Sequence, residues 1–266
     1  MTNLTLYHHG PSTCSQKVRL ILELKNLSYE SKEIDLLAGE QHAPEYVKLN
    51  PNHVVPTLVT GDSVLIESNL ILEYLDDAFP DIPARPSAPE AVHKVRLWMK
   101  HIDVFQQFTG PITYGIAVRR VQMGKSDEEK EAALMSIPDP VKRQARKETM
   151  ENGIKAQIVI SSLKKAGEFL DRMEENIEDS GWIVGDKFGL ADACTLPYIQ
   201  RFDHLALSDA FSETKRPKIN NWYKKVKDLD FFDKAITSHL QPPLVDMMGK
   251  FGEEVKDEAL KIMEER

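Results

Sequence analysis

Alternating apolar and polar residues at the start of the chain predict a strand, and a longer apolar period predicts a helix directly after it. Leu4 and Leu6 alternate with Thr5 and Tyr7, which is the period of two typical of a β-strand. Within residues 18–25, Val18, Ile21, Leu22 and Lys25 fall on one face of a helix. The polar residues that we expect on the other faces of this helix are Gln16, Arg19 and Glu23.

The next fifty residues predict a second strand, a short helix and a hairpin. Residues 28–34 form a weak strand pattern, and residues 43–49 predict a short helix. Residues 57–68 read as two strands joined by Gly61-Asp62, a dipeptide that favours a tight hairpin turn. Ser68 stands where the following helix, which carries Leu72, needs an N-cap. The first 79 residues therefore predict the order βαβ followed by αββα.

A proline-rich seam separates this part of the chain from the rest. Pro80, Pro83, Pro86 and Pro89 recur at every third residue, which excludes a helix and favours an extended connector. Nearly everything after the seam reads as helix. We expect a fold of the α/β plus all-α class, with an α/β domain at residues 1–79, a linker at 80–90 and an all-helical domain at 91–266.

The helical part contains one long segment, one charged insertion and one clearly amphipathic helix. Residues 90–120 predict a long helix that is disturbed around Gly110-Pro111, and residues 124–148 predict a loop with a short helix. Apolar residues between Val159 and Ile177 recur at spacings of three and four, so this helix buries one stripe in a core. Residues 251–266 predict an acidic surface helix, with a lid or a contact surface as alternatives.

Composition and charge narrow the class of protein. The net charge of −8, with Lys and Arg scattered along the chain, excludes a general nucleic-acid binder, because no basic excess exists to displace counterions. No apolar run approaches the roughly 20 residues of a membrane span, and the first residues lack a signal-peptide pattern. The two cysteines, Cys14 and Cys194, are far apart, which favours reduced thiols. We expect a cytoplasmic protein without membrane or nucleic-acid partners.

The junction between the first strand and the first helix contains hydroxyl and thiol side chains that are candidates for a functional site. Ser12, Thr13, Cys14 and Ser15 stand there in succession. A helix N-terminus offers unpaired backbone N–H groups and about half a positive charge, so an anion or a thiolate is stabilised there. The residues alone leave two interpretations open: helix caps with a packed thiol, or a site for a thiolate. Cys194 is expected to be a buried core thiol.

Two further segments suggest a site for an extended peptide ligand. If the Val55–Pro56 bond in Val-Val-Pro-Thr (residues 54–57) is cis, the backbone N–H and C=O of Val55 turn outward, toward an extended peptide ligand. Glu67-Ser68 then combines a carboxylate, a hydroxyl and a helix start. Such a combination holds both the ammonium and the carboxylate of one amino-acid end.

These segments resemble the thioredoxin-like domain of the cytosolic glutathione transferases. The matching motifs are S-T-C-S-Q-K-V-R at residues 12–19, V-V-P-T-L at 54–58, and E-S followed by N-L-I-L-E-Y-L at 67–75. They occur in the order and spacing of the family. The stretch G-W-I-V-G-D-K-F-G-L-A-D-A-C-T-L-P-Y, residues 181–198, is similar to the family's helical domain. The resemblance covers most of the chain and is weakest at residues 120–150 and beyond 240.

The resemblance implies a role for individual residues. The hydroxyl of Ser12 is expected to hydrogen-bond the glutathione thiolate, and the backbone of Val55, beside cis-Pro56, to pair with the cysteinyl part. Glu67 and Ser68 are expected to hold the γ-glutamyl end. The glycyl carboxylate is expected to contact Gln41, His42 and His53. The walls of the electrophile pocket between the domains are expected to be formed by Trp98, Phe105, Phe108, Tyr114 and Tyr198. The resemblance further implies a homodimer, glutathione as co-substrate and no metal.

The class within the family is less sharply defined. Ser-x-Cys-Ser at residues 12–15 resembles zeta-type isomerases and tetrachlorohydroquinone dehalogenases, in which the cysteine resolves a glutathionyl adduct; Cys14 is the matching residue. The insertion at 120–150 resembles β-aryl etherases, and residues 7–20 resemble the ganglioside-induced, differentiation-associated branch of poor catalysts. The leading hypothesis is a transferase acting on a hydrophobic electrophile, an ether among the candidates. The alternatives are a dehalogenase or isomerase using Cys14, and a non-catalytic glutathione-fold module.

Two positions depart from the family pattern. Val54 stands where many relatives carry Lys or Gln, which removes one polar contact to the glycyl end of glutathione. The family's Ser/Thr-x-x-Asp helix start is Gly189-Leu190-Ala191-Asp192 in this chain. Gly is an acceptable N-cap, and Asp192 is expected to accept hydrogen bonds from the first turn in a structural role.

Overall fold

The computed structural model describes residues 3–36 and 38–265, which fall into two compact units. The first unit comprises Met1–Ile102, Ile177–Pro197 and Trp222–Gln241, and the second comprises Asp103–Asn176, Tyr198–Asn221 and Pro242–Arg266. The chain therefore passes between the units several times, and three helices contribute to both. The expected linear boundaries at residues 79 and 90 stay a prediction.

The first unit is built on a four-stranded sheet of order β2-β1-β3-β4. β1 pairs in parallel with β2 and antiparallel with β3, and β3 pairs antiparallel with β4. The predicted βαβ and αββα order is confirmed, with a hairpin turn at Gly61 in the left-handed region (φ 56°). The strands are β1 Leu4–His8, β2 Tyr29–Glu33, β3 Thr57–Thr60 and β4 Ser63–Leu65.

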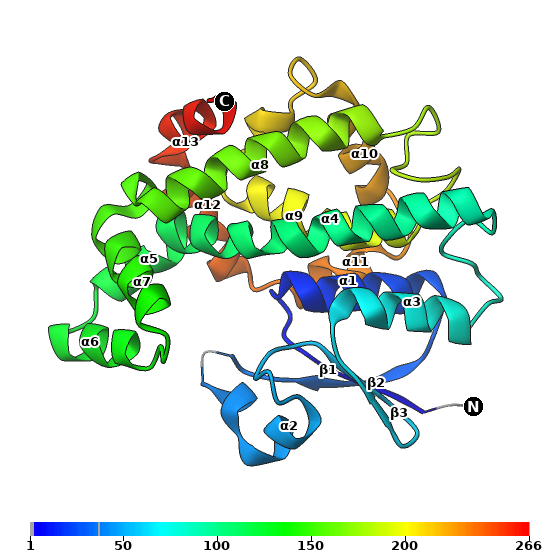
Figure 1. The fold of residues 1–266 in the computed structure, drawn as a ribbon, viewed down its shortest axis with the longest axis horizontal. Helices are drawn as coiled ribbons and strands as arrows, with labels where there is room; N and C mark the ends of the chain where they lie inside the picture. The colour runs from blue at the N-terminus through cyan, green and yellow to red at the C-terminus, as the bar shows by residue number, and fades with distance from the viewer. Residues whose placement is uncertain (1–2, 37, 266) are drawn as a thin grey trace. The chain divides into compact units, whose positions relative to one another are not determined.

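Helices cover both faces of this sheet (Figure 1). Leu4 and Leu6 of β1 are buried on one face, where α1 and α3 lie side by side. Tyr7 points to the other face and packs against the α2 residue Tyr46. The helices before the proline seam, with the 3-10 turn that precedes α2, are α1 Thr13–Leu24, η1 Glu40–His42, α2 Pro44–Leu49 and α3 Ser68–Ala78.

The polar residues on the other faces of α1 are not exposed to solvent. Gln16, Arg19 and Glu23 are as buried as the apolar stripe, and Lys17 is also buried. The reason is long-range packing, because Arg19 and Glu23 contact Ala235 and Lys234 of α11, and Lys17 donates to Asn69 of α3. The pattern of polar and apolar residues in a helix does not predict a contact with an element that lies more than 200 residues later in the chain.

The remaining elements are all helical in the part of the chain that the structure describes. The predicted disturbance of the long helix is found just after Pro111, which lacks an N–H, as a π-helical stretch, η2. The elements are α4 Pro89–Thr113, η2 Tyr114–Val118, α5 Arg119–Met123, α6 Asp127–Met135, α7 Pro140–Asn152, η3 Gly153–Lys155, α8 Gln157–Asn176, α9 Leu190–His204, η4 Ser208–Phe211, α10 Pro217–Lys227, α11 Phe232–Ala235, η5 Thr237–His239, α12 Pro242–Glu253 and α13 Lys256–Glu264.

The charged insertion at residues 124–148 holds more helix than the sequence predicted. Ser126 and Glu129 form a reciprocal capping box at the start of α6. Asp139 accepts backbone hydrogen bonds at the start of α7, whose first residue is Pro140. The two prolines therefore lie before or at a helix start, where proline is tolerated, and do not break the segment into loops.

The second unit has the predicted amphipathic helix α8 at its core. The stripe from Val159 to Met173 is fully buried, as expected. The C-terminal helix α13 packs directly against α8, since a Cβ on Gly167 would lie 1.8 Å from the carbonyl oxygen of Met263. Ala259, Ile262 and Met263 are buried, so the tail is an amphipathic part of this core and not a fully solvated helix.

Candidate functional site

The connections that carry the predicted glutathione residues all leave the sheet of the first unit at the same end. β1 and β2 are parallel, and their last residues, His8 and Glu33, are partners in the register. Tyr7 of β1 pairs with Thr57, the first residue of β3, and Leu65, the last residue of β4, pairs with Leu58. The turn into α1, the loop toward α2, the segment before β3 and the turn into α3 are therefore neighbours.

Ser12 is the N-cap of α1. Its extended backbone (φ −68°, ψ 122°) and its Oγ, which accepts the N–H of Ser15 at 3.3 Å, are the geometry of that position. Its own N–H donates to the carbonyl of His9 at 3.0 Å, which closes the turn after β1. Ser12 and Cys14 are both half-buried. The hydroxyl and the thiol thus lie at the N-terminus of a twelve-residue helix.

The buried side chain of Arg19 donates a hydrogen bond to the turn between β1 and α1. Arg19 donates from Nη2 to the carbonyl of Gly10 at 2.9 Å and from Nε to the carbonyl of Ala235 at 2.7 Å, and its Nη1 lies 3.0 Å from His8 Nδ1. Burial lowers the pKa of Arg19 to about 10 and, with the help of Arg19, lowers the pKa of His8 to about 3. At neutral pH the pair is therefore a guanidinium beside a neutral imidazole.

Gly10 is required at the turn because another backbone segment approaches it closely. A Cβ at this position would lie 2.3 Å from the carbonyl oxygen of His239. The N–H of Gly10 donates to Glu33 at 2.8 Å, so the carboxylate at the end of β2 also holds the turn. The segment from His9 to Ser12 is thereby fixed by contacts to β2, α1 and the α11 region.

The segment before β3 contains the expected cis peptide between Val55 and Pro56. The carbonyl of Val54 accepts from Tyr46 Oη at 2.6 Å and from Asn50 Nδ2 at 2.9 Å, which anchors the loop on α2 and its end. Val55 is buried against the side chains of Tyr46 and Ile34. Its backbone thus has a fixed position at the end of β3 that faces the turn into α1.

The start of α3 corrects one prediction. The N-cap is Glu67, not Ser68, and Glu67 has a left-handed backbone (φ 68°) without a side-chain cap hydrogen bond. Ser68 is the first helical residue and is buried. The side chain of Glu67 is exposed and lies 3.5 Å from Asn52 Nδ2. Asn52, which follows Pro51 in an ordinary turn, has no sequence signal that singles it out.

Gln41, His42 and His53 form one cluster, in which the two histidines are exposed and Gln41 is half-buried. The Nδ1 atoms of the two histidines are 3.2 Å apart, and Gln41 Nε2 lies 3.2 Å from His42 Nε2. Their positions join the turn before α2 to the loop before Pro56, and His53 has a left-handed backbone (φ 56°). The cluster gathers N–H donors that suit a carboxylate.

The aromatic residues predicted for the electrophile pocket fall into two groups. Trp98, Phe105 and Tyr198 are buried: Trp98 donates to Thr195 at 2.7 Å, Phe105 stacks on Phe169 with ring centres 4.0 Å apart, and Tyr198 donates to Gln106 at 3.2 Å. Phe108 and Tyr114 of the second unit are half-buried, and the Tyr114 ring carries the Arg146 guanidinium at 3.8 Å.

The helix α9 contains the predicted structural carboxylate. Asp192 accepts from the N–H groups of Gly189 and Ile183 at 3.0 and 3.1 Å and from Trp222 Nε1 at 2.7 Å. Burial raises the pKa of Asp192 to about 6, although these donors oppose the rise. Cys194 is fully buried, as expected for a core thiol.

Metal and membrane signals are absent from the described residues. Within residues 3–36 and 38–265, no group of at least three His, Cys, Asp or Glu side chains is arranged to hold a metal ion. Among the helices of the same ranges, none has the length and apolarity needed to cross a bilayer.

Known proteins match this chain over both of its parts. The model of the glutathione S-transferase N-terminal domain matches residues 2–77, and that of the C-terminal domain matches residues 130–230. Protein LigF of Sphingobium sp. is 28% identical over 84% of this chain and 89% of its own length. The tetrachloro-p-hydroquinone reductive dehalogenase of Sphingobium chlorophenolicum is 30% identical over 88% of this chain and 96% of its own length.

Solved structures agree with these matches. The β-etherase LigF superposes with a TM-score of 0.76 at 27% identity, over 89% of this chain and 98% of that chain. A glutathione transferase homologue from Drosophila mojavensis, solved with bound glutathione, shares the fold with a TM-score of 0.63 at 22% identity, over 94% and 98% of the two chains. The chain, with its four-stranded α/β part followed by helices, belongs to the glutathione S-transferase family.

Proposed function

We propose that this protein binds glutathione at the end of the sheet in the first unit and uses the glutathione thiolate as a nucleophile. The thiolate attacks an electrophilic carbon of a hydrophobic co-substrate, a C–S bond forms, and the leaving group departs with its electron pair. The protein contributes the activated nucleophile and the proximity of the two reactants.

One observation carries this proposal. The strand register brings the Ser12 turn, the Val55–Pro56 segment and the start of α3 to one end of the sheet, so two helix N-termini face the same region. A thiolate near Ser12 is stabilised by the N–H groups and dipole of α1, and the hydroxyl of Ser12 donates one further hydrogen bond. The cap bond from Ser15 leaves the Ser12 proton available, because the Oγ accepts there.

The remaining parts of glutathione are assigned by chemistry. The γ-glutamyl end carries an ammonium and a carboxylate, which suit the exposed carboxylate of Glu67 and the N–H and hydroxyl of Ser68. The cysteinyl backbone pairs with the N–H and C=O of Val55. The glycyl carboxylate meets the cluster of Gln41, His42 and His53, whose ring and amide N–H groups are donors.

The co-substrate is proposed to be an aryl compound with a good leaving group, an ether among the candidates. The name of the relative LigF, a β-etherase, favours an ether. Phe108 and Tyr114 of the second unit, which are half-buried, are the proposed contacts to it. As partner and location we propose a second copy of the same chain and the cytoplasm, as is usual for proteins of this type.

A second candidate function uses Cys14. The dehalogenase relative and the place of Cys14 in the first turn of α1, two residues after Ser12, favour it. The Cys14 thiolate attacks the sulfur of a glutathionyl adduct and forms a mixed disulfide with glutathione. The substrate carbon leaves with the electron pair and takes a proton, and a second glutathione thiolate then reduces the disulfide.

The test of the first function is the pH profile of kcat/KM for Ser12→Ala with a generic aryl halide electrophile. A hydrogen bond to a charged group contributes about 1.5–3 kcal/mol, so turnover at pH 7 should fall about 10- to 100-fold and recover partly at high pH. Ser12→Asn separates the two roles of the residue, because Asn keeps the cap but lacks the hydroxyl. It should lose turnover like the Ala variant.

The matched control is Ser126→Ala, which removes a serine N-cap from α6, in the second unit. It should lose a similar ~1 kcal/mol of cap stability with no change in the pH profile. Neutral-pH turnover that is unchanged in both Ser12 variants would remove Ser12 from the mechanism. Loss of reductive activity in Cys14→Ser, with conjugation retained, would support the second function.

A further inference from the structure

A pocket in the first unit, separate from the turn that carries Ser12, is lined mostly by polar residues. It has a volume of about 500 Å³ and lies beside the C-terminal end of α1, the first residues of β2 and α11. Its walls include the Glu23 carboxylate, the Tyr29 hydroxyl, the Asn26 amide and the hydroxyls of Ser28 and Ser31. Leu27 supplies the apolar part of the wall.

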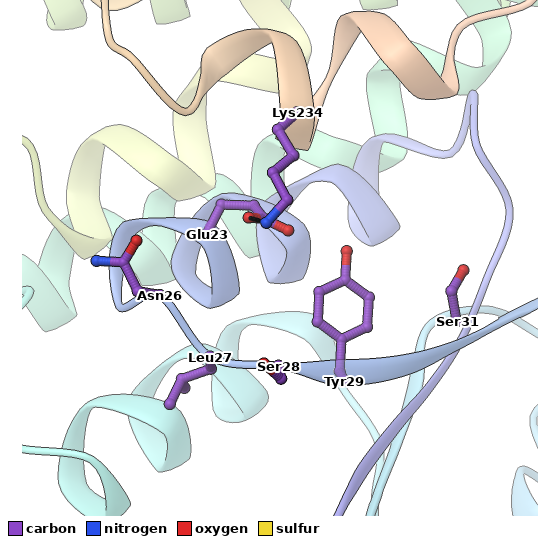
Figure 2. A pocket seen from close by; sticks show the side chains of 7 residues that line it. All are labelled: Glu23, Asn26, Leu27, Ser28, Tyr29, Ser31 and Lys234. Atoms are coloured by element: carbon purple, nitrogen blue, oxygen red, sulfur yellow. Dashed lines mark ion pairs between the residues drawn. The ribbon is translucent and has the colours of Figure 1, made fainter.

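The pocket contains the carboxylate of Glu23, which is paired with the exposed side chain of Lys234. The Glu23 side chain is only 4% exposed, whereas that of Lys234, whose Nζ lies 2.5 Å from Glu23 Oε2, is 75% exposed. Figure 2 shows Lys234 reaching from α11 to the carboxylate, with the Tyr29 ring rising from β2 toward the same group. The carboxylate belongs to the packed interior, while its counter-ion is a flexible side chain on a four-residue helix.

The groups around Glu23 suit a primary ammonium ion. Burial raises the pKa of Tyr29 to about 12, so its hydroxyl stays neutral and adds no second negative charge. An ammonium has three N–H donors, and the oxygens of Glu23, Ser28 and Ser31 are acceptors in the same pocket. Lys234 lines the pocket and holds its ammonium on Glu23, and a free alkylammonium carries the same charged group on an alkyl stem.

We propose that this pocket is a binding site for a small primary alkylamine in its ammonium form, which replaces the Lys234 ammonium on Glu23. In the resting protein Lys234 is a tethered occupant, with an effective concentration in the millimolar range. The free ligand displaces it, and α11 loses its ion pair to α1.

This site is connected to the turn that holds Ser12. The carbonyl of Ala235, next to Lys234, accepts from Arg19, and Arg19 in turn donates to the carbonyl of Gly10. On the opposite wall, the hydroxyl of Ser31 lies 2.7 Å from His8 Nε2, and His8 contacts Arg19. Release of Lys234 therefore loosens one of the contacts that fix Arg19, and the amine acts as an effector that weakens glutathione binding. This coupling, unlike amine binding itself, rests on the proposed function.

The test of binding is calorimetric titration with n-butylammonium chloride, an analogue of the lysine side chain. Lys234→Ala should bind it at least tenfold more tightly than the wild type, because the tethered competitor is gone. The double variant Glu23→Gln/Lys234→Ala should show no binding, and Lys165→Ala, which breaks an exposed ion pair with Glu168, should behave as the wild type. Equal affinity for the single and double variants would overturn the site.

Two further measurements keep the outcome clear. If the double variant does not fold, backbone amide shifts of Lys234→Ala on addition of the amine replace it. Changes confined to residues 8–31 and 232–239, which line or contact the pocket, support the site, and changes elsewhere overturn it. Tetramethylammonium, which has no N–H donor, should not bind.

In the wild type the saturating amine should raise the Kd of glutathione at least threefold, and an unchanged Kd would overturn the coupling. A protein that binds the amine but no glutathione would refute the proposed function and leave the amine site standing.

Discussion

At the scale of single residues, the chemistry attributed to Ser12 depends on a residue that a ligand does not touch. Arg19 is fully buried and has no exposed surface to offer to substrate. It acts on Ser12 only through the carbonyl of Gly10 and through His8. Its role is therefore that of a positioning residue for the turn after β1.

Replacement of Arg19 should change thiol activation as well as stability. Arg19→Met leaves the carbonyls of Gly10 and Ala235 without this donor, at a cost of roughly 2–4 kcal/mol, and Arg19→Lys keeps the charge but loses the fork of donors. In both variants we expect the apparent pKa of the bound thiol in the kcat/KM profile to rise, with the smaller rise in Lys. A variant with similar loss of stability at a distant helix, Asp192→Asn, should keep the wild-type profile. Identical profiles in all variants would contradict the positioning role.

Ser12 and Arg19 also show what the sequence reveals and what it conceals. The polar run before a helix predicted the cap and the candidate nucleophile site, because capping is a local property. Arg19 is buried and donates to the carbonyl of Ala235 in α11, and nothing in the local sequence pattern predicts that contact. Lys17 donates to Asn69 at 3.2 Å, a contact between α1 and α3 that is equally invisible in the local pattern.

At the scale of elements, the start of α9 depends on one buried carboxylate. Asp192 satisfies two backbone N–H groups and the indole of Trp222, and its pKa of about 6 lies above the unfolded value of 3.8. A raised pKa means that the folded state binds the proton more tightly, so this contribution is fully present below pH 4 and is lost as pH rises through about 6.

Asp192→Asn should therefore show a pH-dependent loss of stability. Asn accepts with one oxygen only and places N–H groups against other donors, so the variant is destabilised at all pH values. Because Asn does not titrate, the difference in free energy of unfolding from the wild type should be larger at pH 4.5 than at pH 7, by roughly 2–3 kcal/mol. Urea denaturation at both pH values measures it. A difference that is equal at both values, or larger at pH 7, would contradict the assignment.

Element types were predicted better than element neighbours. The strands, the hairpin, the proline seam and the buried stripe of α8 follow from periodicity and turn residues, which are local. The N-cap of α3 was misplaced by one residue because Glu67 adopts a left-handed backbone that is rare for its type. The buried face of α13 was not predicted. It depends on Gly167 of α8, where the missing Cβ lets the backbone of Met263 approach closely, and the sequence does not show that contact.

At the scale of the whole molecule, membership of the glutathione S-transferase family accounts for both the α/β unit and the helical unit. The first unit supplies a sheet end with two helix N-termini, and the second supplies an all-helical core with half-buried aromatic rings on α4 and η2. The electrophile was beyond sequence reasoning, because apolar walls are built from positions that many residues fill. The proposed glutathione site could be argued from the sequence, because it rests on a helix cap, a cis-proline and a charged helix start.

The most direct test of this account is the proton balance of glutathione binding. Isothermal titration at pH 7 in two buffers of different ionisation enthalpy separates the protons released from the heat of binding. A free thiol has a pKa near 8.5, so stabilisation of the thiolate by Ser12 and the start of α1 predicts release of close to one proton per site. Binding without proton release would contradict thiol activation, and no binding at millimolar glutathione would contradict the function itself.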